Sequence, residues 1–191
     1  MKQFLLVVFV IFHLNIFAQK PCDIGANVTD SLGTYKTTKD YLLYEKNFDG
    51  KSKYIFASFV LTDGTPTLNV QLLEKSKTFI KTHCFDENSK IYIQLINGKI
   101  VTLMQVNKES CATLLQGQDG YNNRVLTGIF MFKKDGYEDL KKSAVSYIRI
   151  KYSTDVEDYI FKKELKSELD SKIYQPETYF MDYLHCIEDN N

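Results

Sequence analysis

Four cysteines and two histidines are the side chains of this sequence whose possible chemistry is easiest to specify. The cysteines are Cys22, Cys84, Cys111 and Cys186. His83 directly precedes one of them and His185 directly precedes another. An even number of cysteines in an exported chain favours disulfides, and four cysteines allow three pairings.

A zinc site is the alternative use of these residues, with His83-Cys84 and His185-Cys186 as its two halves. Zinc ligands usually come in pairs spaced two to four residues apart. Adjacent residues instead point to opposite sides of a strand, or about 100° apart on a helix. The two dipeptides would therefore not readily converge, and nothing nearby marks an activated thiolate. We expect no metal site and no cofactor.

A hairpin turn indicates which cysteines pair. Asn97-Gly98 suits a two-residue turn, because both positions of that turn favour positive φ. Cys84 and Cys111 are equally far from this turn, so folding of the hairpin should bring them together. This predicts a Cys84–Cys111 bridge. Cys22–Cys186 follows by elimination and requires the end of the chain to dock beside the start of the mature protein.

The strands of this hairpin are expected over 90–96 and 99–106. A two-residue turn fixes their register and sets Ile96 opposite Lys99. The pairs that then share one face are Leu95 with Ile100, Ile93 with Thr102, and Ile91 with Met104. That face is largely apolar, as expected for strands that cover a core.

The first eighteen residues have the features of a cleavable export signal. Lys2 precedes an apolar run over 4–12, and Ala18 offers the small side chain that a signal peptidase needs. The sequence therefore predicts a signal peptide over 1–18, a mature chain that begins at Gln19, and a periplasmic or secreted location. The alternatives are an uncleaved anchor, for which the run is too short, and a lipoprotein, which needs small residues just before Cys22. No second run is long enough to cross a membrane.

Composition and motifs exclude some functions and assign none. The chain has 24 basic and 24 acidic residues, a balance that argues against nucleic acid as a partner. It lacks a Gly-rich phosphate loop, a Gly-x-Ser-x-Gly elbow and a His-Glu-x-x-His motif. The acidic pairs Glu138-Asp139 and Glu157-Asp158 fall in expected turns or helix starts, where carboxylates are normally solvated. We assign no catalytic residue, although a glycosidase could use any two carboxylates.

Aromatic residues are frequent, with 13 Tyr and 13 Phe but no Trp. Strands favour such residues, and tyrosine tolerates partial burial. A carbohydrate-binding platform is the alternative, although the absence of Trp removes the broadest stacking surface.

The elements that must position these residues are mostly strands. Alternating or β-branched patterns predict strands over 34–48, 53–62, 67–74, 125–133, 144–152 and 159–163. Turn residues separate the early strands at Asp49-Gly50 and at 63–66. The segment 108–124 lacks periodicity and is expected to be a long loop, and 153–158 a turn.

In the strand over 144–152, we expect one face to cover the core and the other to end charged. The expected core face holds Ala144, Ile148, Ile150 and Tyr152, and the opposite face holds Val145, Tyr147, Arg149 and Lys151.

Two helical regions are expected. Asp135 and Glu138 resemble a capping box before a short helix over 137–142. The tail from Leu165 is expected to be helical, because Leu165 and Leu169 are four residues apart, and Pro176 suits a first helical position. The last helix carries an apolar stripe made of Phe180, Tyr183, Leu184 and Ile187.

The chain is therefore expected to form one β-rich domain over 19–191. Its fold class is mostly β (α+β), an antiparallel β-sandwich-like arrangement with a short internal helix and a C-terminal helix.

The layout resembles a loose group of uncharacterised exported proteins of the Bacteroidota. The resemblance rests on the Ala18-Gln19 junction with a cysteine soon after it, Asn97-Gly98-Lys99 between strands, and the 147–150 strand followed by a final helix with Cys186. It covers most of the mature chain, does not extend to the Cys84 and Cys111 pair, and implies no particular activity.

We therefore expect a non-enzymatic binding or structural protein of the cell envelope, whose partner is an envelope protein or glycan. The alternative is a hydrolase that acts on envelope glycan through two carboxylates.

Overall fold

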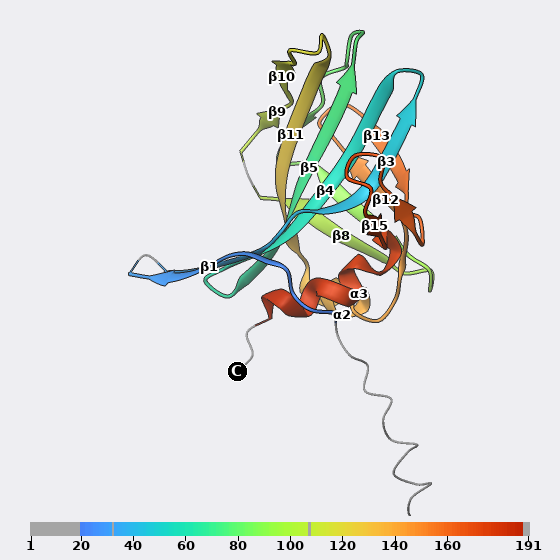
Figure 1. Ribbon diagram of the computed structural model, residues 1–191. Coiled ribbons are helices and arrows are strands. Elements are labelled where there is room, and N and C mark those ends of the chain that lie inside the picture. Colours follow the sequence, from blue (N-terminus) through green and yellow to red (C-terminus); the bar gives the residue numbers. More distant parts are fainter. Residues whose placement is uncertain (1–19, 32, 107, 189–191) are drawn as a thin grey trace, which may run out of the picture.

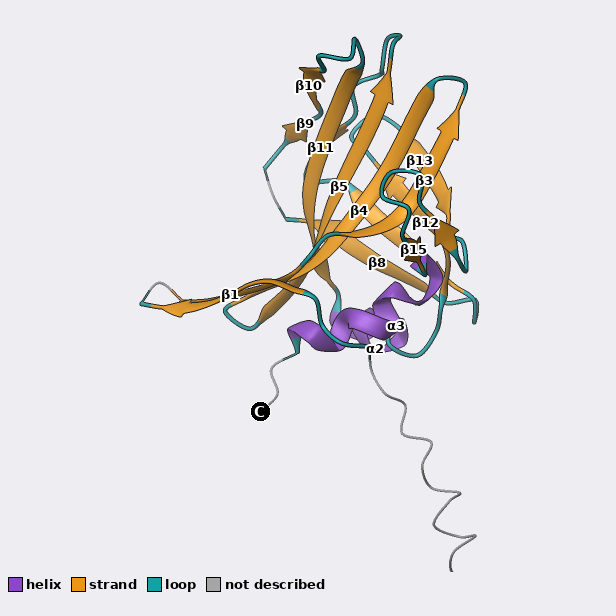
Figure 2. Ribbon diagram, viewed as in Figure 1, coloured by secondary structure: helices purple, strands orange, loops and turns teal. Residues whose placement is uncertain are grey.

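The structure, a computed structural model, describes residues 20–31, 33–106 and 108–188 (Figure 1). The expected signal peptide and the Ala18-Gln19 junction lie outside these residues. Strands dominate the described chain and helices are few and short (Figure 2). The mostly β fold class with antiparallel sheets and a short C-terminal helix is therefore confirmed. None of the described helices has the length and apolar character that a membrane crossing requires.

The strands are distributed along most of the described chain. Their bounds are β1 Ile24–Asp30, β2 Gly33–Thr38, β3 Tyr41–Phe48, β4 Lys51–Thr62, β5 Thr65–Ser76, β6 Cys84–Phe85, β7 Lys90–Leu95, β8 Ile100–Gln105, β9 Ser110–Cys111, β10 Thr113–Gln116, β11 Asn122–Phe132, β12 Val145–Lys151, β13 Val156–Ile160, β14 Leu165–Lys166 and β15 Ile173–Tyr174. The helices are α2 Lys134–Leu140 and α3 Tyr179–Tyr183, with 3-10 turns over Pro176–Thr178 and Leu184–Ile187.

Most strands belong to one antiparallel sheet of eleven strands, in the order β1-β2-β4-β5-β11-β8-β7-β12-β13. The sheet branches at two long strands. β4 pairs with β3 over its first part and with β2 at its end. β11 pairs with β10 at its start and with β8 at its end.

This sheet curls until its last strand faces β3. The ring of Tyr159 on β13 packs edge-on against Tyr44 of β3, with 5.1 Å between centroids, although β13 and β3 share no backbone pairing. The enclosed core is aliphatic and aromatic, with Ile55, Phe85 and Phe130 fully buried. The result is sandwich-like, because two halves of one sheet cover a common core.

The C-terminal helix lies across the lower end of this sheet in Figure 1. Tyr179 stacks on Phe59 of β4 with ring centroids 4.7 Å apart, and its hydroxyl donates to the carbonyl of Ala57 at 3.2 Å. The predicted apolar stripe does face the core, since Phe180, Leu184 and Ile187 are buried and Tyr183 is half-buried.

The structure pairs the cysteines as the sequence analysis predicted, with bridges Cys22–Cys186 and Cys84–Cys111. Cys84 and Cys111 lie opposite each other in the short β6–β9 ladder. This ladder packs closely over β11, where a Cβ on Gly128 would come within 2.7 Å of the Phe85 ring. Only glycine allows this approach.

The expected hairpin register is wrong by one residue. Leu95, not Ile96, lies opposite Lys99, and Ile93 pairs with Val101. The connection is a three-residue loop in which Gly98 alone adopts positive φ, while the Asn97 side chain accepts a hydrogen bond from the Lys99 amide.

A slip of one residue exchanges the faces of the second strand. Val101, Leu103 and Gln105 are therefore buried, whereas Ile100 is exposed and Thr102 and Met104 are only partly covered. Cys84 and Cys111 still meet, because the irregular segment between β6 and β7 and its counterpart before β9 restore the register.

Other boundaries also differ from expectation. The expected strand 34–48 is two strands, β2 and β3, and the expected loop 108–124 contains β9 and β10. The expected turn 153–158 includes the start of β13. A register shift between Val145 and Tyr147 turns Val145 into the core, opposite to the predicted face.

The helix predictions are only partly correct. α2 begins three residues before the expected start, and its N-cap residue, Lys133, makes no side-chain cap hydrogen bond, so the capping box is absent. The tail over 165–175 is not helical. It forms the β14–β15 hairpin, and helical structure begins only at Pro176.

Candidate functional site

Charged and aromatic side chains meet where the ends of β4, β5 and β13 come together. Lys53 of β4 lies directly opposite Glu74 of β5 in the sheet. Glu157 comes from β13, Asp155 from the turn before it, and His83 from the segment that leads into β6. These five side chains are called the polar network below.

Lys53 lies between two carboxylates. Its Nζ is 3.0 Å from Oε1 of Glu74 and 2.7 Å from Oε2 of Glu157. Burial alone would lower the pKa of Lys53, but the hydrogen bonds and charges of the two glutamates outweigh it and raise that pKa. Burial alone would likewise raise the pKa of Glu157, but the hydrogen bonds from Lys53 and Tyr159 lower it. Both groups are therefore held in their charged forms at neutral pH.

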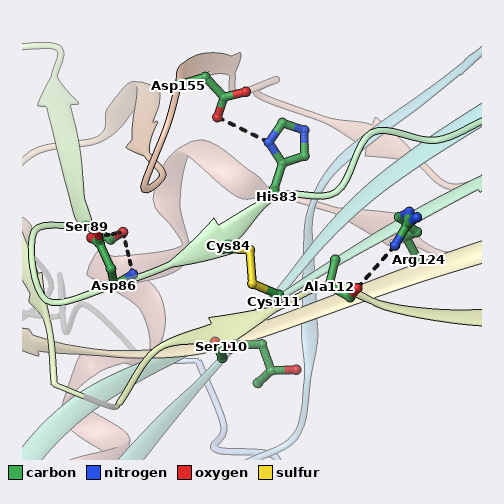
Figure 3. Close-up of a disulfide and its surroundings, with 10 residues drawn as sticks. His83, Cys84, Asp86, Ser89, Ser110, Cys111, Ala112, Arg124 and Asp155 are labelled. Atoms are coloured by element: carbon green, nitrogen blue, oxygen red, sulfur yellow. Dashed lines mark hydrogen bonds and ion pairs between the residues drawn. A yellow bond between two sulfur atoms is a disulfide. The ribbon is translucent and has the colours of Figure 1, made fainter.

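His83 is buried among the acidic side chains, with 7% of its surface exposed. Its Nδ1 lies 3.2 Å from Oδ1 of Asp155, while its Nε2 lies 3.8 Å from Glu74 and 3.7 Å from Glu157. The ring packs on Tyr152 with 4.5 Å between centroids. Figure 3 shows the imidazole directed towards Asp155 and away from the neighbouring disulfide.

The segment that carries His83 is anchored from both sides. The Arg124 guanidinium donates to the carbonyls of Ile80 at 2.8 Å and Ala112 at 3.2 Å, the second of which is drawn in Figure 3. The amide of Ala112 donates to the carbonyl of His83 at 2.9 Å. β11 and the chain after β9 thus fix the position of the imidazole.

Two buried tyrosines extend the polar network into the core. The Tyr159 hydroxyl donates to Glu157, and the hydroxyls of Tyr152 and Tyr159 are 2.7 Å apart. Burial is the main cause that raises the pKa of each phenol well above its ordinary value. Both tyrosines are therefore neutral hydrogen-bonding groups at any physiological pH.

A cleft of about 640 Å³ opens beside this network. Lys53, Glu74 and Glu157 form part of its wall, and the remaining lining residues are Tyr44, Lys46, Phe48, Lys51, Ser52, Lys75, Ser76, Phe79, Ile80, Lys81, Asp158 and Tyr159. The size falls within the range of small-molecule sites, roughly 300–1,000 Å³. Phe48 and Phe79 are 74% and 82% exposed.

The charges of the cleft are not fully balanced. Every carboxylate in its lining has a cationic partner: Glu74 and Glu157 pair with Lys53, and Asp158 pairs with Arg149. Of the lysines, Lys75 pairs with Asp119 and Lys81 with Asp155. Among the described residues, Lys46 and Lys51 make no ion pair, and the lining holds five lysines against three carboxylates, of which Glu74 and Glu157 share Lys53.

Sequence reasoning located the four cysteines but missed the polar network. It placed Glu157 in a solvated turn, whereas Glu157 lies on a strand and holds Lys53. One signal could have found part of the network. A two-residue turn at Asp63-Gly64, both with positive φ, sets Lys53 opposite Glu74.

Comparison of the chain with protein-family models, with curated proteins and with solved structures found no match.

Proposed function

We propose that this chain is an exported, non-enzymatic binding domain of the cell envelope, and that its cleft takes an acidic glycan. The observation that carries this proposal is the charge of the cleft: its lining holds five lysines against three carboxylates, each carboxylate already contacts a cation, and Lys46 and Lys51 make no ion pair among the described residues. Export is supported by the signal-like residues 1–18, and the two disulfides agree with an oxidising compartment.

The aromatic side chains favour a sugar as the ligand. Phe48 and Phe79 offer exposed ring faces at the cleft, and apolar faces of sugar rings pack on such surfaces. Lysine ammonium groups beside them provide the charge-assisted hydrogen bonds that a carboxylate accepts. Together they suit a sugar that bears a negative charge.

A glycan hydrolase is the second candidate, because Glu74 and Glu157 lie close enough together for both to contact Lys53. Such an enzyme needs one carboxylic acid with a raised pKa to protonate the leaving group. Burial would raise the pKa of Glu157, but its bonds to Lys53 and Tyr159 lower it instead. This favours binding over hydrolysis.

Calorimetric titration with an oligogalacturonate, which carries one carboxylate per sugar, tests the proposal against its neutral methyl ester. We expect the acidic oligosaccharide to bind and the ester to bind much more weakly. The double substitution Lys46→Met with Lys51→Met should weaken binding about tenfold or more, because two charge-assisted contacts are lost.

Lys142→Met is the matched control, because Lys142 is exposed and lies outside the cleft lining. It should leave the affinity unchanged. Equal binding of the acid and the ester, or no binding of either, would contradict the proposal. Release of shorter sugars during the titration, abolished by Glu157→Gln, would support the hydrolase instead.

A further inference from the structure

The Cys22–Cys186 bridge has a histidine against both of its sulfurs. Nε2 of His185 lies 3.3 Å from Sγ of Cys22 and 3.7 Å from Sγ of Cys186. One ligand atom from each of these three residues lies within 4.8 Å of the other two. They are called the sulfur–histidine group below, and they share no residue with the cleft.

Among the described residues, the hydrogen bonds of the His185 ring are weak ones to sulfur. Its Nδ1 is buried and has no hydrogen-bond partner among the described residues, while its Nε2 contacts only the two sulfurs. A buried polar atom without a partner costs about 1–3 kcal/mol. The described fold therefore gives the ring no hydrogen bond beyond its contacts with the two sulfurs.

The spacing of these atoms matches a tetrahedral metal site. With Zn–S of about 2.3 Å and Zn–N of about 2.0–2.1 Å, the nitrogen and each sulfur would be roughly 3.5 Å apart. The two observed nitrogen–sulfur distances, 3.3 and 3.7 Å, lie on either side of this value. The same geometry requires the two sulfurs to be about 3.8 Å apart, which the covalent bridge prevents.

The chain allows the sulfurs to separate once the bond is broken. Cys22 is exposed and lies in the segment before β1, whereas Cys186 is buried in the 3-10 turn Leu184–Ile187. Only the exposed end must move, and the neighbouring Lys20 is held to Asp182 at 2.8 Å, which keeps the segment close to the helix.

We propose that reduction of the Cys22–Cys186 bridge converts Cys22, His185 and Cys186 into a site for a soft divalent cation such as Zn²⁺. A dithiol supplies two electrons and two protons, becomes a cyclic disulfide, and leaves two protein thiols. Zn²⁺ then displaces both thiol protons and binds two thiolates and Nε2 of His185, with water in the fourth position. Metal affinity at this site is thus controlled by the redox state of one disulfide.

Titration with Co²⁺, a spectroscopic substitute for Zn²⁺, tests this in the full exported chain. A phosphine reductant opens the bridge by transferring its electrons to the sulfurs and taking oxygen from water. We expect one Co²⁺ per reduced chain, with a thiolate-to-cobalt charge-transfer band and visible bands of tetrahedral intensity. The oxidised chain should show neither band.

Three variants distinguish this site from incidental binding to thiols. His185→Gln should weaken Co²⁺ binding by on the order of 100-fold, since loss of a ligand costs at least as much as loss of an outer-shell partner. His83→Gln is the matched control and should leave the Co²⁺ affinity unchanged. His83 also precedes a cysteine, but its ring points away from that sulfur (Figure 3). The double variant Cys84→Ser with Cys111→Ser should bind Co²⁺ as the reduced parent does.

Absence of the charge-transfer band in the reduced chain would overturn the proposal, as would equal affinity in His185→Gln. If reduction unfolds the chain, circular dichroism should show that one equivalent of Zn²⁺ restores the fold in the parent and not in His185→Gln. Failure of Zn²⁺ to restore it would equally overturn the proposal.

Discussion

His83-Cys84 leads into a β-strand, whereas His185-Cys186 lies in a 3-10 turn near the end of the chain. Adjacent side chains point to opposite sides of a strand. The His83 ring therefore points away from the Cys84–Cys111 bridge and lies in the polar network (Figure 3). In a 3-10 turn, adjacent side chains are about 120° apart, so they do not lie on opposite sides as they do in a strand. The ring of His185 can therefore contact the sulfur of the next residue.

The difference between these two regions shows that the local backbone geometry, and not the His-Cys dipeptide itself, determines which groups each histidine contacts. His83 has a carboxylate partner and packs against the ring of Tyr152, and both contacts are structural roles in the described fold. Within the described part of the chain His185 has neither, and the hydrogen-bond partners of its ring are the two sulfurs. Three measurements can break or sharpen this comparison.

Removal of each disulfide should give the largest effects. In the chain-entropy model, Cys22–Cys186, with a sequence separation of 164, contributes about 5 kcal/mol, and Cys84–Cys111, with a separation of 27, about 3.5 kcal/mol. We expect paired Cys→Ser substitutions to lower the free energy of unfolding in that order, measured by urea denaturation. The reverse order would show that the polar network depends on Cys84–Cys111 more than loop length implies.

Substitution of the two histidines should separate their roles in the oxidised chain. His83→Gln removes the contact with Asp155 and the ring packing on Tyr152, and should lower the free energy of unfolding by about 1–3 kcal/mol. His185→Gln removes no hydrogen bond other than weak ones to sulfur, so its cost should be under about 1 kcal/mol. Thermal unfolding of both variants provides the measurement. Equal losses would contradict the distinction between the two histidines.

The Cys84–Cys111 bridge could be predicted from sequence because the two cysteines lie equally far from the hairpin turn. A small error in the register of the hairpin does not change this, and the Cys22–Cys186 bridge follows by elimination. Cys84 and Cys111 pair even though the register of the hairpin between them is wrong by one residue. The strands could be predicted for a similar reason, since alternation of apolar residues is averaged over several positions. The face of each strand could not, because one bulge, as between Val145 and Tyr147, reverses it.

The polar network could not be predicted because its members come from separate elements. Only Lys53 and Glu74 are linked by a local turn. Glu157 joins them through the curl of the whole sheet, which brings β13 to β4 without backbone pairing. The sulfur–histidine group has the same origin, since Cys22 and His185 lie at opposite ends of the chain.

Acid should weaken the polar network, with the smallest of the three effects. Burial tends to raise the pKa values of Asp155 and Glu157, but their hydrogen-bonded cations lower them in the folded state. A lowered folded pKa means that stabilisation is complete above the unfolded pKa, about 4 for these groups, and is lost as pH falls through the folded pKa. We therefore expect the free energy of unfolding to decline below about pH 5.

The variant Glu157→Gln tests whether this decline in the free energy of unfolding arises from the polar network. The variant should be less stable than the parent at pH 7, and the difference should narrow towards pH 3, because protonation of Glu157 in the parent removes the same charge. Urea midpoints at pH 7, 5, 4 and 3 give the measurement. Glu138→Gln is the control, since the Glu138 side chain is 58% exposed and lies on α2, outside the network. The urea midpoint of this variant, plotted against pH, should stay parallel to that of the parent. A constant difference between Glu157→Gln and the parent from pH 7 to 3 would show that the Lys53–Glu157 contact does not hold the carboxylate in its charged form.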